Sequence, residues 1–457
     1  MSELEVKKRK LKNILLERNI NQTLKSSIKD GIFSSTMVGF GESFFSAFAV
    51  FLKANNIQLG LLGSLPQTLG SLSQLLSNKI IDYFKSRKKV VCIGAFLQAL
   101  MYIPIAFLFL FEKFNIYYLL LFVSLYWIFG TIISPAWNSW IGELVPSEKR
   151  GVYFGKRNKL AGFSSFISFL MGGYILQILS SGKTQYIGFT IIFLIAFASR
   201  IISFYYLTKG YEHKYVTVNE AKFTFIEFLK KAKFRNYGLF VIYLCTMNFS
   251  IYIAAPFFAP YMLNNLNFDY KTFTIVSAAA LITKFIMMPM WGKLTDKYGS
   301  KKVLTVSGFL MPILPLLWTL STDLFYLILI QIYSGFVWAG FEMASFNFIF
   351  DSTSQEKRAT CVAYFNVLNG FFILIGAILG GLIVRYNHMF WSKYYLVFIV
   401  SFVLRYLSSL IFLPRLKEVR DVERIPYNRL LFKAFTSMPT TGMIHHLITL
   451  TKRDRKY

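Results

Sequence analysis

Apolar stretches long enough to cross a membrane recur along almost the whole of this 457-residue chain. About 20 residues of α-helix span the ~30 Å hydrocarbon core of a bilayer. A soluble protein could not bury so many stretches of this kind. With 55% hydrophobic and 16% charged residues, the composition agrees with a membrane domain. The sequence therefore predicts an all-α polytopic membrane protein.

The apolar stretches form two sets of six, which predicts twelve transmembrane helices. The spans are expected at residues 28–52, 57–80, 89–111, 116–141, 159–180 and 186–208, and again at 237–261, 271–291, 302–321, 324–349, 359–384 and 393–413. We expect a basic N-terminal tail at 1–27, a six-helix bundle at 28–208, a linker at 209–236, a second six-helix bundle at 237–413 and a basic C-terminal tail at 414–457. The linker segment "KFTFIEFLKKAKFRN" has the spacing of an amphipathic helix, and "YNRLLFKAF" in the C-terminal tail resembles it.

The formal net charge of +28 is chiefly a topology signal. Clustered Lys and Arg can neutralise nucleic-acid phosphates, but here their placement follows the positive-inside rule. Most of the 50 basic residues lie in the tails and in loops on the same side of the predicted membrane. The opposite loops carry only Lys53, Lys113, Lys183, Lys271, Arg385 and Lys393. We therefore expect a plasma-membrane protein with both termini cytoplasmic and no nucleic-acid partner.

The two halves repeat one another in sequence. At an offset of 208 residues, the loop "GELVPSEKRGVYFGKRNKLAG" after the fourth span aligns with "FDSTSQEKRATCVAYFNVLNG" after the tenth. At an offset of 214 residues, "SNKIIDYFKSRKKVV" aligns with "WGKLTDKYGSKKV". Halves in the same orientation are typical of parallel repeats about an axis along the membrane normal.

At these residues the sequence resembles the major facilitator superfamily, over nearly the whole predicted membrane region. The family's cytoplasmic hairpin follows G-x-L-x-D-x-x-G-[RK]-[RK]. The second copy here matches it, with one extra spacer residue, at Gly292, Leu294, Asp296, Gly299 and Lys301. In the first copy, Asn78 and Lys85 replace the two glycines. The resemblance implies two six-helix bundles that rock about a central site, as in a secondary transporter.

The charged hairpins suggest a gate. Gly299 can adopt positive φ in the tight reversal, and Gly292 is expected to let helices pack closely. We expect Asp82 to meet the start of the fifth span near Arg150, and Asp296 the start of the eleventh near Arg358. The resemblance implies that such contacts hold the cytoplasmic face shut. The alternative is that these charges only anchor the loops among lipid headgroups.

Charged residues inside predicted spans need an explanation, because each costs several kcal/mol. Arg200 in the first half and Arg405 in the second occupy corresponding positions, which favours snorkelling or pairing between helices. Glu42, Lys284 and Glu342 have no charged counterpart, which makes them candidates for solute binding or proton coupling. A structural ion pair between Lys284 and Glu342 is the alternative. The polar neighbours that either bind solute or bond between helices are Gln67, Asn138 and Asn248.

The function expected is transport of a small solute by a monomer in the bilayer, with proton coupling or with facilitated diffusion. A transport-deficient sensor with the same fold is the rival. No catalytic constellation appears, and we expect no enzyme activity, no cofactor and no metal. "SGKT" at 181–184 lacks the earlier glycine of a phosphate-binding loop. "GFSSFISFLMGG" and "LTKGYEHK" lack the family's antiporter and sugar-porter motifs, so no subfamily is assigned.

Overall fold

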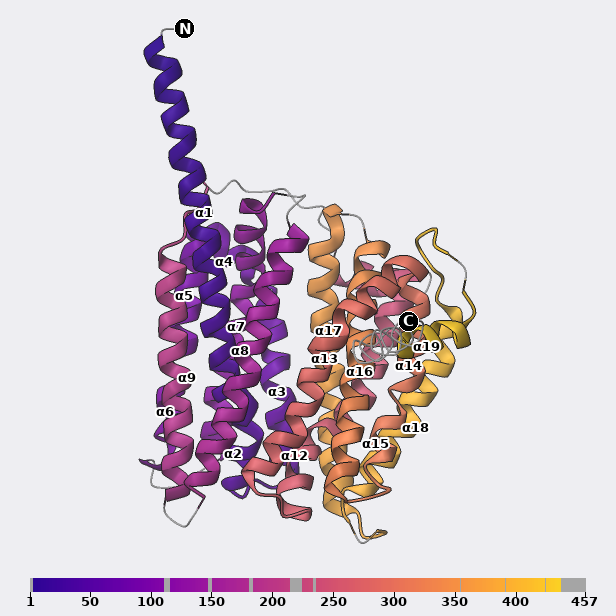
Figure 1. Ribbon diagram of the computed structural model, residues 1–457. Coiled ribbons are helices and arrows are strands. Elements are labelled where there is room, and N and C mark those ends of the chain that lie inside the picture. Colours follow the sequence, from indigo (N-terminus) through magenta and orange to yellow (C-terminus); the bar gives the residue numbers. More distant parts are fainter. Residues whose placement is uncertain are drawn as a thin grey trace, which may run out of the picture. The chain divides into compact units, whose positions relative to one another are not determined.

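The computed structural model describes residues 3–110, 116–146, 150–180, 184–213, 224–232, 236–353, 355–390, 392–423 and 425–436. These residues form α-helices with short 3-10 and π turns, and no strand occurs among them (Figure 1). The chain forms two compact units. Unit 1 comprises Met1–Asn219 and Pro256–Thr274, and unit 2 comprises Glu220–Ala255 and Ile275–Tyr457.

Unit 1 is built mainly from the first half of the chain. Its elements are α1 (Glu3–Phe40), η1 (Glu42–Phe44), α2 (Phe45–Phe51), α3 (Asn56–Gln74), α4 (Ser77–Phe84), α5 (Arg87–Leu100), α6 (Tyr102–Ala106), η2 (Leu108–Leu110), α7 (Ile116–Leu144), α8 (Arg150–Ile178), α9 (Thr184–Thr208), α12 (Phe258–Pro260) and η5 (Tyr261–Asn265). The first residues of α13 also belong to it. There, Gln185 Nε2 donates to the Tyr270 hydroxyl at 2.8 Å, and the ring of Phe189 packs edge-on against that of Tyr270.

Unit 2 contains most of the second half. Its elements are α10 (Phe225–Ala232), α11 (Asn236–Ala254), α13 (Tyr270–Tyr298, from Ile275 onward), α14 (Ser300–Leu310), α15 (Ile313–Leu317), α16 (Leu324–Ser352), α17 (Gln355–Tyr386), α18 (Tyr395–Phe412), η6 (Leu413–Arg415) and α19 (Tyr427–Thr436). The turn η4 (Ala255–Phe257) lies where the units divide. Within the two amphipathic segments expected from the sequence, Phe225–Ala232 and Tyr427–Thr436 are helical, as α10 and α19.

Ten helical stretches among the described residues are long and apolar enough to cross a membrane. They are Arg87–Ala106, Ile116–Leu144, Tyr153–Ile178, Thr184–Thr208, Asn236–Asn265, Tyr270–Tyr298, Ser300–Leu317, Leu324–Ser352, Thr360–Tyr386 and Tyr395–Arg415. The other two predicted spans, 28–52 and 57–80, are interrupted. The first passes from α1 through η1 to α2, and the second from α3 to α4. The count of twelve therefore stays a prediction.

The two hairpins reverse the chain with positive φ in both copies. Gly299 has φ of 93°, as the tight turn required, and immediately precedes α14 as its N-cap. Lys85, which replaces that glycine in the first copy, adopts φ of 49° at the end of α4. A non-glycine residue tolerates this region at a modest cost. The first copy of the hairpin thus keeps the turn although a lysine replaces the glycine.

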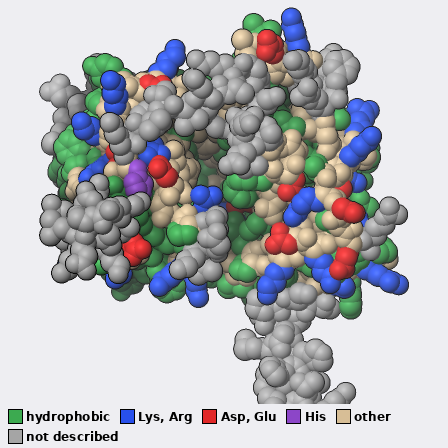
Figure 2. All heavy atoms as spheres, turned by 90° about the horizontal axis from the view of Figure 1, so that it is seen from above, with side chains coloured by type: hydrophobic (Ala, Val, Ile, Leu, Met, Phe, Trp, Pro, Cys, Tyr) green, Lys and Arg blue, Asp and Glu red, His purple; other side chains and the backbone are tan. Residues whose placement is uncertain are grey.

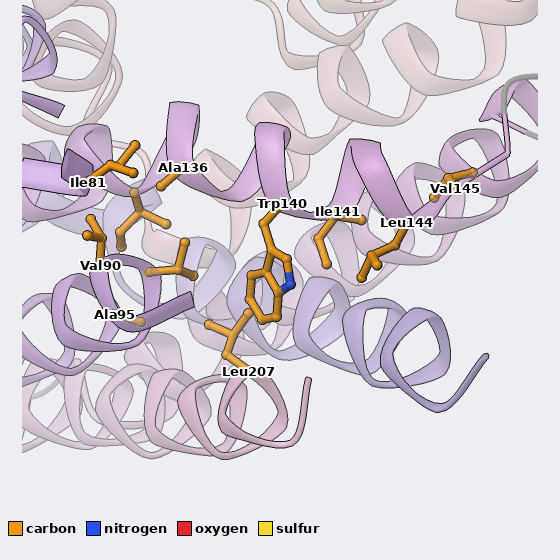
Figure 3. Close-up of a cluster of buried hydrophobic side chains, with 11 residues drawn as sticks. Ile81, Val90, Ala95, Ala136, Trp140, Ile141, Leu144, Val145 and Leu207 are labelled. Carbon is orange, nitrogen blue, oxygen red and sulfur yellow. The ribbon is translucent and has the colours of Figure 1, made fainter. Parts of the chain in front are cut away.

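A buried apolar cluster joins α4, α5, α7 and α9 beside the first hairpin (Figure 3). Trp140 at its centre is 1% exposed, with Val91 from α5 and Leu207 from α9 in the same cluster. The Trp140 indole N–H donates to the Tyr211 carbonyl at 2.8 Å, which satisfies its one polar atom. This packing fixes the residues after α9 against the start of α5.

Candidate functional site

Unit 1 contains an open cavity of about 340 Å³ lined by residues of α1, α5, α7, α8 and α9 and by Glu42 of η1. Its lining includes two carboxylates, Asp30 and Glu42, and two guanidinium groups, Arg157 and Arg200. The aromatic side chains of Tyr126, Trp127 and Trp137 also line it. A volume of this order and a few polar groups on an aromatic wall are typical of small-molecule sites.

Glu42 reaches this cavity from the break in the first predicted span. The α-helical bonding of α1 gives way at Gly41 to the single 3-10 turn η1, which begins with Glu42. The Tyr126 hydroxyl on α7 donates to Glu42 Oε2 at 2.8 Å. Tyr126 is 1% exposed, so this neutral hydroxyl holds the carboxylate in a largely buried setting.

Asp30 is the second carboxylate at the cavity, and it is paired. Arg157 Nη2 lies 3.2 Å from Asp30 Oδ2, and the Ser203 hydroxyl donates to Asp30 Oδ1 at 2.7 Å. Arg200 Nη1 in turn donates to the Ser203 hydroxyl at 2.9 Å. The Arg157 guanidinium also stacks 4.2 Å from the centre of the Trp137 ring. This cluster joins α1, α7, α8 and α9.

Sequence reasoning missed Asp30 and Arg157. Asp30 stands inside the predicted span 28–52, and Arg157 stands just before the span at 159–180. The repeat gave a usable signal, because the residue 208 positions after Arg157 is Phe365. Arg157, like Glu42, has no charged counterpart in the other half of the chain, so the same comparison would have identified it as a candidate.

In unit 2, the pairing expected as the alternative for Lys284 and Glu342 is present. Lys284 Nζ on α13 lies 3.1 Å from Glu342 Oε1 on α16. Their side chains are 26% and 39% exposed, so neither charge is fully buried within the described residues. Whether the pair also serves the solute stays a prediction.

The two repeated arginines have different surroundings. Arg200 joins the Asp30 cluster, whereas Arg405 on α18 is 3% exposed and donates from Nη2 to the Ile251 carbonyl at 3.4 Å. Arg405 therefore bonds to a neighbouring helix, as predicted, but its partner is a backbone carbonyl and not a side chain.

The predicted polar neighbours make short-range or interhelical bonds. Asn248 Nδ2 donates to Asn369 Oδ1 at 2.8 Å and so links α11 to α17. Gln67 Nε2 donates to the Gly63 carbonyl at 3.3 Å, and Asn138 Nδ2 lies 3.5 Å from the Ser134 hydroxyl. None of the three lines the cavity of unit 1 described above. A role for them in solute binding remains untested.

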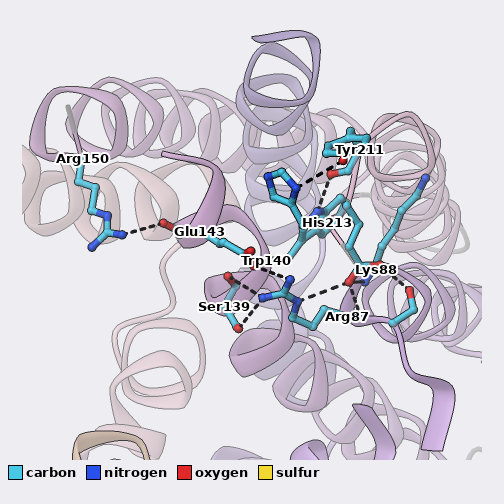
Figure 4. A network of polar contacts seen from close by, with 11 residues as sticks. Arg87, Lys88, Ser139, Trp140, Glu143, Arg150, Tyr211 and His213 are labelled. Atoms are coloured by element: carbon cyan, nitrogen blue, oxygen red, sulfur yellow. Dashed lines mark hydrogen bonds and ion pairs between the residues drawn. The ribbon is translucent and has the colours of Figure 1, made fainter. Parts of the chain in front are cut away.

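A charged network surrounds the start of α5 (Figure 4). Glu212, in the segment after α9, accepts from the Ser86 hydroxyl at 2.6 Å and from the Arg87 backbone N–H at 2.7 Å. Arg87 Nη2 lies 2.5 Å from Glu143 Oε2 at the end of α7, and Nη1 donates to the Ser139 hydroxyl at 3.1 Å. A carboxylate at a helix N-terminus accepts its otherwise unpaired N–H groups.

The second half has a corresponding network. Glu418, after η6, accepts from the Lys301 backbone N–H at 2.9 Å at the start of α14. The Ser300 hydroxyl donates to Asp351 Oδ2 at 2.6 Å. Arg420 Nε lies 3.1 Å from the same oxygen, without hydrogen-bond geometry, and Arg420 Nη1 lies 3.9 Å from Asp296 Oδ1. Glu212 and Glu418 each follow the last long helix of their half, a correspondence that sequence reasoning missed.

The C-terminal segment continues along this hairpin. Lys433 Nζ on α19 donates to the Tyr298 hydroxyl at 2.6 Å, and Lys301 Nζ donates to the Tyr427 hydroxyl at 3.0 Å. On the surface that it views, Figure 2 shows Lys and Arg side chains with carboxylates among them. The segment after η6 thus packs onto the second hairpin.

The predicted gate residues lie in or beside these networks. Arg150 donates to the carbonyls of Gly142 and Val145 at 3.1 and 3.3 Å, and Asp82 is exposed on α4. The Arg358 side chain lies outside the described residues, so the pairing of Asp296 with it stays a prediction. Residues 437–457 of the tail also lie outside them.

Close packing at Gly292 is not seen among the described residues. There, an added Cβ would meet the Met343 Cε at the ordinary contact distance of 3.9 Å. The role of Gly292 in helix packing stays a prediction.

No group of three or more His, Cys, Asp or Glu side chains within the described ranges could hold a metal ion.

A family model described as Major Facilitator Superfamily matches residues 31–258 and 239–449. No curated protein matches the chain.

Several solved structures share the fold at low identity. The nucleoside transporter NupG is 16% identical, with 87% of this chain and 99% of that chain covered and a TM-score of 0.63. A bacterial homologue of the iron transporter ferroportin, in an inward-facing state, is 13% identical, with 87% and 98% covered and a TM-score of 0.63. A bacterial homologue of the human lysosomal transporter Spinster, inward-facing and unoccupied, is 14% identical, with 88% and 99% covered and a TM-score of 0.58.

Proposed function

Because the chain belongs to the major facilitator superfamily, we propose that it moves a small solute across a membrane by alternating access, coupled to a proton bound at Glu42. The protein is an integral membrane protein with a transporter fold. We propose further that it works as a monomer in the plasma membrane, with both termini in the cytoplasm. The excess of basic residues in the tails and in the loops on the same side of the predicted membrane supports this orientation.

The different partners of the two carboxylates at the cavity of unit 1 carry the proposal. Asp30 is held by the Arg157 guanidinium and by the Ser203 hydroxyl, so its ionised form is stabilised. The polar partner of Glu42 within the described chain is the neutral Tyr126 hydroxyl. A carboxylate without a paired cation in a low-dielectric setting is the one that gains most from binding a proton. Glu42 is therefore the proton carrier and Asp30 the fixed charge.

Lys284 and Glu342 would then serve the solute within unit 2. Their partial exposure and the absence of a charged counterpart in the repeat support this role. The contacts of the hairpins with Glu212 and Glu418 support a role for these segments in the conformational cycle.

Uptake by reconstituted vesicles tests the proposal. Vesicles that hold the protein and a pH-sensitive dye are screened against small solutes, with and without an imposed proton gradient. We expect solute entry to carry protons and to be accelerated by an inward gradient in the native chain. In Glu42→Gln, solute exchange should persist while gradient-driven accumulation is lost.

The matched control is Glu423→Gln, which removes an exposed carboxylate of unit 2 outside this cavity and should keep both uptake and its proton dependence. Gradient-independent uptake by the native chain would show facilitated diffusion instead. Absence of uptake for every solute, together with binding of a cytosolic protein, would favour the sensor.

A further inference from the structure

The cavity of unit 1 contains more positive than negative charge when Glu42 is protonated. Asp30 carries one negative charge, whereas Arg157 and Arg200 carry two positive charges. The Arg200 guanidinium reaches Asp30 through the Ser203 hydroxyl, and Asp30 is already paired with Arg157. An uncompensated cation in a low-dielectric site calls for an anion.

Two buried donors at the cavity also lack acceptors. Arg200 is 6% exposed, and its Nε has no hydrogen-bond partner among the described residues. The Trp137 indole N–H is likewise buried without a partner there. A buried donor left unpaired costs about 1–3 kcal/mol, so both favour a ligand rich in acceptor oxygens.

From the charge excess and these donors we propose that the cavity binds a small organic monoanion, with a carboxylate toward Arg200 and Trp137 and its body against the aromatic wall. This inference rests on the proposed function, because it names the solute class for the same site. Guanidinium groups and indole N–H groups suit a planar carboxylate. The wall of Tyr126, Trp127 and Trp137 suits an apolar or flat body.

The charge balance couples this anion to the proton on Glu42. The groups that face Glu42 are Tyr126 on α7 and Tyr102 on α6, and the other charges at the cavity are Asp30, Arg157 and Arg200. With Glu42 ionised the cavity is neutral, and with Glu42 protonated it carries one positive charge. An anion therefore binds more tightly after Glu42 takes up a proton, and by linkage its binding promotes that uptake. Anion and proton would cross the membrane together.

Calorimetric titration of the purified full-length protein tests the anion site. The probes are acetate, lactate, benzoate and phenylacetate, with 2-phenylethanol and phenethylamine as neutral and cationic analogues of phenylacetate. We expect at least one monoanion to bind, and to bind more tightly at pH 5.5 than at pH 7.5. Titration in two buffers of different ionisation enthalpy should show uptake of up to about one proton per anion bound at the higher pH.

Three variants sharpen the test. Glu42→Gln mimics the protonated carboxylate, so it should bind the anion at pH 7.5 as tightly as the native chain does at pH 5.5, without proton uptake. Arg200→Gln should weaken binding about tenfold or more, and Trp137→Phe about fivefold. Arg405→Gln is the matched control, because it removes the equivalent buried arginine of unit 2, and it should leave the affinity unchanged.

If Arg200→Gln does not fold, Arg200→Lys and the other two variants still decide the matter. Equal or tighter binding of the neutral or cationic analogue, no binding of any monoanion, or equal losses in Arg200→Gln and Arg405→Gln would each overturn the anion site. Glu42-dependent, proton-driven uptake of a neutral solute would overturn this inference and leave the proposed function intact. Anion binding without transport of any solute would remove the proposed function instead.

Discussion

Glu418 accepts a hydrogen bond from the backbone N–H of Lys301 at 2.9 Å. The same relationship joins Glu212 to Arg87 at 2.7 Å in the other half. In both halves a carboxylate that follows the last long helix caps the helix after the charged hairpin. The repeat therefore preserves a contact that ties the end of each half to its own hairpin.

Removal of this cap should destabilise the protein measurably. In Glu418→Ala the first turn of α14 loses its acceptor, and loss of a cap costs about 0.5–2 kcal/mol. We expect the melting temperature in detergent to fall by a few degrees, with a similar fall for Glu212→Ala. Glu423→Gln is the control, since the Glu423 side chain is 64% exposed in its pair with Lys297 and should contribute little. Equal melting temperatures for Glu418→Ala and Glu423→Gln would contradict the capping role.

Arg420 should hold the C-terminal segment on the second hairpin. It lies 3.1 Å from Asp351, and its Nη2 donates to the Thr295 carbonyl at 3.2 Å. In Arg420→Ala, amide hydrogen exchange in α19 should become faster, because several contacts of this segment are lost together. Asp296→Asn is the milder comparison, since Asp296 is 74% exposed and 3.9 Å from Arg420. If exchange in α19 is the same in both variants, Arg420 does not anchor the segment.

Lys284 and Glu342 should matter more for uptake than for stability. Their side chains are partly exposed, so breaking the pair should change stability by about 1 kcal/mol or less. An ionisable pair at membrane depth is otherwise a cost. In the double variant Lys284→Met/Glu342→Gln we expect solute uptake to fall at least tenfold while the melting temperature shifts by only a few degrees. Retained uptake would mean that the pair is structural.

The helical membrane architecture was predictable because bilayer thickness imposes a length on each apolar stretch. The duplicated loops likewise predicted the family and the two hairpins. The first two spans were harder, because nothing in the sequence indicated the break at Gly41 or the interruption between α3 and α4. The turn at Lys85 was also hard to predict. The family motif has a glycine at this position, yet here a lysine adopts the positive φ of 49°.

Glu42 was singled out from sequence because a charge inside a span is conspicuous. Asp30 and Arg157 were not, because each lies near the end of a predicted span, where charges are common. Only the fold brings these two residues, 127 positions apart, to 3.2 Å. The charge excess at the cavity depends on that juxtaposition. It could therefore not be predicted from the separate spans.

A glycine on α1 tests the packing that supports this cavity. A Cβ at Gly39 would lie 2.5 Å from the Ser165 carbonyl oxygen and 2.6 Å from the Ser168 Cβ, so Gly39→Ala must push α1 away from α8. Forced shifts of this kind typically cost 1–3 kcal/mol, and the melting temperature should fall accordingly. Gly142→Ala in α7 is the matched control, because no atom of the described residues outside the local helix lies within 4 Å of the added Cβ. There, the higher helix propensity of Ala should leave stability equal or raise it by up to ~1 kcal/mol. The same melting temperature for both variants would show that α1 and α8 are not packed as described.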